Sequence, residues 1–73
     1  MFISDKTKEL IEEIYKLAQS HLCKLRIIIE PSYITFHIVD DDQNRSLELP
    51  KEAIKVSRIS MKDLALTIFH KLY

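Results

Sequence analysis

The sequence predicts an α+β domain in which a helix, a three-stranded antiparallel meander and a second long helix follow one another, with both helices on one face of the sheet. Apolar residues recur every three or four positions near both ends of the chain, and they alternate with polar residues in the middle. Turn-forming residues separate these segments. With 73 residues, the chain is large enough for one domain.

Residues 4–22 are predicted to form the first helix. Its apolar stripe consists of Leu10, Ile11, Ile14, Leu17, Ala18 and Leu22. Ser4 or Asp5 can accept a hydrogen bond from the free amides of the first turn. We expect the helix to end between residues 21 and 24.

The next segment has the period of two that is typical of strands. Pairing Ile29 with Ile34 places a whole apolar set on one face of a hairpin. This set is Leu25, Ile27, Ile29, Ile34, Phe36 and Ile38. A third short strand is predicted over residues 46–49, with Leu47 opposite Ile38 and Leu49 opposite Phe36.

Residues 51–59 allow two interpretations, a helical turn that starts after Pro50 or further extended chain. The last helix is predicted to start at Ser60, because Asp63 follows it at the spacing of a capping box. Its apolar stripe consists of Met61, Leu64, Ala65, Ile68, Phe69 and Leu72.

The composition excludes several classes of function. Eleven basic and eleven acidic residues cancel, so the broad positive field that drives non-specific nucleic-acid binding is missing. The chain contains no glycine, which excludes the phosphate-binding loops of nucleotide-binding proteins. Cys23 cannot form an internal disulfide, and no signal peptide or membrane span is recognisable. We therefore expect an intracellular, cytoplasmic protein.

The outer face of the predicted sheet is the candidate interaction surface. Its candidate residues are Arg26, Ile28, Tyr33, Thr35, His37, Val39 and Glu48. The predicted register sets Arg26, His37 and Glu48 in one row across the strands. We interpret this row as a surface charge ladder, because an acid–base role for His37 requires a concave pocket that a flat meander does not provide.

Metal sites and cofactor sites are not expected. His21 and Cys23 lie close together in sequence, but the other histidines would have to converge on them from a strand and a distant helix. Asp40, Asp41 and Asp42 form an acidic loop, and Asp40, Asp42 and Asn44 match the first, third and fifth ligand positions of a calcium-binding EF-hand. Arg45 and Lys51 stand where that motif needs glycine and glutamate, so we predict a solvated loop that could attract a basic partner.

The order of helix, three strands and helix resembles that of the double-stranded-RNA-binding domain. The resemblance implies an RNA-binding alternative with a Lys-Lys-x-Ala-Lys cluster at the start of the last helix. Here that helix begins Ser60-Met61-Lys62-Asp63, with one lysine and one acid. A nucleic-acid module would also need Lys24, Arg26, Arg58 and Lys62 to share one patch.

The chain has more apolar residues than its predicted core can bury, and these residues are the basis for the function that we expect. Besides the outer-face residues, the chain carries Ile54, Val56, Ile59, Leu66 and Tyr73 outside its predicted core. We expect a small protein-interaction module, a regulator or inhibitor that occupies the surface of a larger protein partner without catalysis, or that forms a homodimer. In the alternative, a monomer, the stems of Lys24, Arg26 and Glu30 cover these residues. An enzyme would have to use His37 with Glu48.

Overall fold

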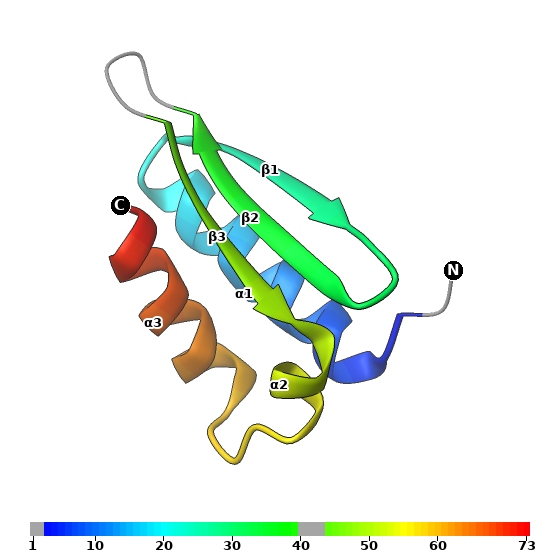
Figure 1. Cartoon of the computed structure of the whole chain (residues 1–73). Coiled ribbons are helices and arrows are strands. Elements are labelled where there is room, and N and C mark those ends of the chain that lie inside the picture. Colours follow the sequence, from blue (N-terminus) through cyan, green and yellow to red (C-terminus); the bar gives the residue numbers. More distant parts are fainter. Residues whose placement is uncertain (1–2, 40–43) are drawn as a thin grey trace.

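The computed structural model describes residues 3–39 and 44–73. Its elements are α1 (Asp5–Ser20), β1 (Lys24–Ile29), β2 (Tyr33–Val39), β3 (Asn44–Pro50), α2 (Lys51–Lys55) and α3 (Met61–Leu72). The strands form one antiparallel sheet in the order β1-β2-β3, and α1 and α3 lie side by side behind it (Figure 1). The predicted α+β meander with both helices on one face is confirmed.

Helix α1 has a side-chain cap at its start and a backbone cap at its end. The Ser4 hydroxyl accepts a hydrogen bond from the Thr7 amide at 3.2 Å, as a helix N-cap does. At the other end the Cys23 amide donates to the Ala18 carbonyl and the Leu22 amide donates to the Gln19 carbonyl. These two bonds make a Schellman motif, whose left-handed position is usually a glycine. In this chain Leu22 occupies it, with a φ of 55°.

The β1–β2 register agrees with the prediction at every position. Ile29 pairs with Ile34, Ile27 with Phe36, and Leu25 with Ile38. Ile34 and Phe36 are fully buried, and Ile38 is nearly so. The apolar face of the hairpin therefore points inward, against the helices.

The predicted β2–β3 register was wrong by two residues. Leu47 lies opposite Phe36 instead of Ile38, and Leu49 lies opposite Ile34 instead of Phe36. Strand β3 is consequently longer than predicted and includes Pro50, which pairs with Tyr33. Since side chains alternate with a period of two, a shift of two residues leaves every side chain on the same face of the sheet. The hydrophobic pattern could not distinguish the two registers.

The ambiguous segment 51–59 begins with the short helix α2. Its N-cap is Pro50, whose extended backbone (φ −63°, ψ 137°) is typical of an N-cap residue but whose side chain makes no capping hydrogen bond. The prediction that Ile54 lies outside the core was wrong, because α2 buries it completely; Val56 and Ile59 are exposed. Of the two interpretations of this segment, the helical turn is the one found.

Helix α3 starts at its predicted cap, where the Ser60 hydroxyl accepts from the Asp63 amide at 3.1 Å. The core joins the inner faces of α1, β2, α2 and α3. Its buried members are Leu10, Ile14, Ala18, Ile34, Phe36, Ile38, Ile54, Met61, Ala65, Ile68, Phe69 and Leu72. His21, predicted at a solvent edge, is exposed, and its ring also contacts those of Phe69 and Tyr73, both at 5.0 Å between centroids.

In residues 3–39 and 44–73, none of the helices combines the length and the apolarity needed to cross a membrane.

Candidate interaction surface

The outer face of the sheet is open, because both long helices pack on the opposite face (Figure 1). Each row of this face holds one residue from each strand. From one end of the sheet to the other, the rows are Lys24–Val39–Asn44, Arg26–His37–Ser46 and Ile28–Thr35–Glu48, followed by the pair Tyr33–Pro50. All seven predicted outer-face residues lie on this surface.

The predicted row of Arg26, His37 and Glu48 is not formed. Arg26 does lie opposite His37, but the next residue in that row is Ser46. Glu48 lies opposite Thr35, one row away. The cause is the two-residue difference in the β2–β3 register. His37 and Glu48, the pair that an enzyme would have to use, are therefore not directly opposite one another on neighbouring strands.

Apolar side chains on this face gather near the end that carries Pro50. Ile28 and Tyr33 are each 44% exposed, and they occupy diagonal positions on neighbouring strands. Pro50 lies opposite Tyr33 and extends this apolar area onto β3. Val39, 36% exposed, lies at the other end of the sheet. Diagonal neighbours are within reach of aromatic side chains, so Ile28 and Tyr33 present a joint surface to a partner.

The charges on this face are separated by sign. Lys24 and Arg26 lie at the Val39 end of β1, whereas Glu30 follows the other end of β1 and Glu48 lies on β3. Within the part of the chain that the structure describes, none of these four charges forms an ion pair. Among the described residues, this surface therefore has a basic end and an acidic end.

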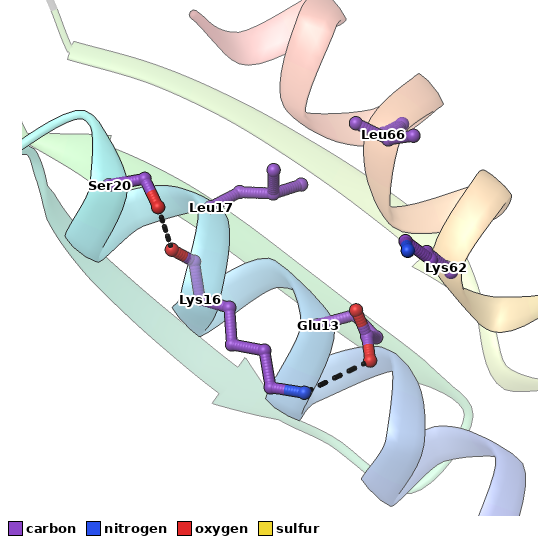
Figure 2. Close-up of a pocket in the computed structure, with 6 residues that line it drawn as sticks. All are labelled: Glu13, Lys16, Leu17, Ser20, Lys62 and Leu66. Atoms are coloured by element: carbon purple, nitrogen blue, oxygen red, sulfur yellow. Dashed lines mark hydrogen bonds and ion pairs between the residues drawn. The ribbon is translucent and has the colours of Figure 1, made fainter.

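The helical layer carries a concavity between α1 and α3. Figure 2 shows it, lined by Glu13, Lys16, Leu17, Ser20, Lys62 and Leu66, with a volume of about 300 Å³. Leu17 and Leu66 point toward one another across it. Lys16 pairs with Glu13 at 3.3 Å, and the Ser20 hydroxyl donates to the Lys16 carbonyl at 3.0 Å. Because these polar groups bind one another, few remain to orient a ligand.

The cations required by a nucleic-acid module do not gather in one patch. Lys24 and Arg26 lie on the outer sheet face, whereas Lys62 lines the groove in the helical layer on the other side of the molecule. Arg58 lies between α2 and α3. Phosphate contacts along one nucleic-acid strand require neighbouring cations, so this arrangement does not favour that alternative.

From the sequence, no metal site was expected near His21 and Cys23, and a solvated acidic loop was expected at Asp40, Asp41 and Asp42. Over the described ranges 3–39 and 44–73, no three His, Cys, Asp or Glu residues come together as a metal site. His21 and Cys23 instead bond to the backbone of α1, through Nδ1 to Leu17 O at 2.9 Å and through Sγ to Ala18 O at 3.6 Å. Asp40, Asp41 and Asp42 lie outside the described residues.

Sequence reasoning missed two exposed apolar residues of α1 and its cap. Leu22 was assigned to the apolar stripe but is 94% exposed, because it lies beyond the last helical turn. Tyr15 is 44% exposed on the helix itself. Helices commonly end in a residue with a left-handed backbone, which is usually glycine. Because this chain contains no glycine, the sequence already indicated that another residue near the end of the helix, here Leu22, could take that conformation.

Comparison with known proteins gave no match: no protein-family model, no curated protein and no solved structure is similar to this chain. Its function must therefore be argued from the surface geometry alone.

Proposed function

We propose that this protein is a small cytoplasmic interaction module that binds a larger protein partner through the outer face of its sheet. It acts as a regulator or inhibitor by occupying the partner's surface, and it performs no catalysis. The observation that carries the proposal is an uncovered sheet face that exposes Ile28, Tyr33 and Val39 and carries basic residues toward one end and acidic residues toward the other.

The exposed apolar side chains are the energetic reason to expect a partner. Ile28 and Tyr33 both lie on strands that the core holds in place through Ile27, Ile29 and Ile34. A rigid apolar surface loses little conformational entropy when it is covered, which favours binding. Aromatic residues such as Tyr33 are also enriched among those that dominate binding energies.

The charge separation defines the partner's chemistry. A complementary protein surface places acidic groups over Lys24 and Arg26, basic groups over Glu30 and Glu48, and an apolar centre over Ile28. The same apolar residues support the second form of the proposal, in which two copies of this chain associate.

Photo-crosslinking tests the proposal with a matched control inside the same chain. Tyr33 on the sheet and Tyr15 on α1 are both 44% exposed, so a photoreactive phenylalanine analogue at either position samples solvent equally. We expect protein adducts from position 33 and few from position 15 when the cell extract is irradiated. Adducts should be lost when Ile28→Ala is added.

Three results would contradict the proposal. Equal adducts at positions 15 and 33 would show that the sheet face is not selective. Adducts with nucleic acid alone, weakening steeply with salt, would favour the nucleic-acid alternative. Turnover of a substrate by the purified chain would show catalysis.

A further inference from the structure

The two edges of the sheet differ in what their backbones offer. The Glu30 amide donates to the Tyr33 carbonyl at 2.8 Å, so Glu30 belongs to a hydrogen-bonded pair of the β1–β2 ladder. Such pairs alternate along antiparallel strands. The amides and carbonyls of Leu25, Ile27 and Ile29 therefore point away from β2, toward the open edge of β1.

Strand β3 does not offer an equivalent edge. The Lys51 amide donates to the Ser32 carbonyl at 2.9 Å, and the same alternation directs the backbones of Ser46, Glu48 and Pro50 outward. Pro50 has no amide hydrogen, and α2 begins directly after it. In the described part of the chain β1 pairs with β2 alone, so its edge is free along the whole strand.

We infer that β1 pairs antiparallel with β1 of a second copy of this chain, about a two-fold axis at Ile27. In this register Ile27 lies opposite the partner's Ile27, and Leu25 lies opposite the partner's Ile29. All three are positions whose backbones face the open edge, so about six backbone hydrogen bonds join the two copies. The result is a continuous six-stranded sheet.

The register is self-complementary in charge. On the outer face Lys24 lies opposite the partner's Glu30, and the two-fold axis repeats this pair at the other end of the interface. Arg26 faces the partner's Ile28, so it lies diagonal both to the same partner carboxylate and to the partner's Arg26, each within reach of a long side chain. Neither Lys24 nor Glu30 forms an ion pair within the described residues of its own chain, so both are available.

The register also covers apolar side chains. Leu25, Ile27 and Ile29 pack against the core but remain only partly buried, as expected for an edge strand with no neighbour on one side. Placing Leu25 beside the partner's Ile29 on the helical side removes further apolar surface from water.

Neighbouring registers are worse. An axis at Arg26 places two arginines directly opposite one another, and like charges at that position are destabilising. An axis at Ile28 places Arg26 opposite the partner's Glu30, but it leaves Lys24 without an acidic residue opposite it and places Leu25 opposite the partner's Pro31, which has no amide hydrogen to donate. A two-fold axis that falls between two residues would place each residue whose backbone faces the open edge opposite a partner residue whose backbone faces its own β2. The backbone hydrogen bonds between the two copies could then not form.

A charge exchange tests the interface by sedimentation of the full chain. We expect the wild-type protein to form a dimer of two 8.6 kDa chains in a concentration-dependent manner. Glu30→Lys should raise the dimer dissociation constant about tenfold or more, because two attractive pairs become repulsive. The double variant Lys24→Glu/Glu30→Lys restores opposite charges and should recover most of the affinity. Circular dichroism confirms that each variant is folded.

Hydrogen exchange supplies a second readout at the edge itself. The Ile27 amide should exchange more slowly as the protein concentration rises through the dissociation constant. A chain that stays monomeric at millimolar concentration, an Ile27 amide that gains no protection, or a Glu30→Lys dimer as tight as the wild type would each overturn the inference. The inference would also be overturned if the Ile27 amide became protected only after an unrelated extended peptide was added, because the edge would then pair with other chains and not with a second copy.

This inference concerns the edge of the sheet and stands apart from what the outer face binds. Tyr33→Ala, which lies on β2 and away from the β1 edge, should abolish binding of the larger partner and leave the β1 dimer intact. A dimer that survives Glu30→Lys but is lost in Tyr33→Ala would overturn the edge pairing while supporting self-association through the outer face.

Discussion

Neighbouring residues of β2 lie in two different environments. Ile34 and Phe36 are fully buried against the helices, whereas Thr35 and His37, each one residue further along, lie half-buried on the open face. Both faces belong to the same strand and carry apolar residues, but only the inner one is covered by α1 and α3. The difference shows that apolar burial, which stabilises the fold, is concentrated on one face of this sheet, while the other face is not covered by the helices.

The largest expected difference between the two faces is in the free energy of unfolding when a large inner side chain is removed. Phe36→Ala should lower the free energy of unfolding by about 3–5 kcal/mol, because it leaves a cavity that the core cannot refill. His37→Ala, one residue away, should change it by less than about 1 kcal/mol. Urea denaturation followed by circular dichroism measures both. Equal losses would mean that the outer face also contributes to the core.

The short helix α2 extends the comparison to a segment outside the sheet. Ile54 is fully buried, and Val56, two residues later, is 62% exposed. We expect Ile54→Ala to cost about 2–5 kcal/mol and Val56→Ala to stay within about 0.5 kcal/mol. If thermal unfolding shows Val56→Ala to be as costly as Ile54→Ala, the exposed apolar residues are part of the core in solution.

Replacing Leu22 should give the smallest change in the free energy of unfolding, and it tests whether a highly exposed apolar side chain contributes to stability. Its left-handed backbone costs a leucine about 1 kcal/mol, and its 94% exposed side chain contributes little burial in return. Leu22→Gly should therefore stabilise the protein by up to about 1 kcal/mol. Leu22→Ala is the control, because alanine pays the same backbone penalty and should give no comparable gain. A loss of stability in Leu22→Gly would show that the leucine side chain makes contacts that its exposure does not indicate.

Much of the candidate surface was predictable because face assignment depends on parity alone. Once Ile34, Phe36 and Ile38 point inward, Tyr33, Thr35, His37 and Val39 must point outward. The wrong part of the prediction was which residues share a row. Glu48 belongs with Thr35 and not with His37, because the hydrophobic pattern is unchanged by a shift of two residues.

The sequence by itself determined the two long helices, the β1–β2 register and the inward set of β2. Helical and strand periodicities are local, and the cap residues Ser4 and Ser60 mark where the long helices start. Only the tertiary structure decided the β2–β3 register and the helical state of residues 51–55. Both depend on how segments distant in sequence pack, since burial of Ile54 and the fit of Leu47 against Phe36 select among local conformations that are close in energy. The left-handed Leu22 instead belongs to a local Schellman motif, and its side chain is exposed.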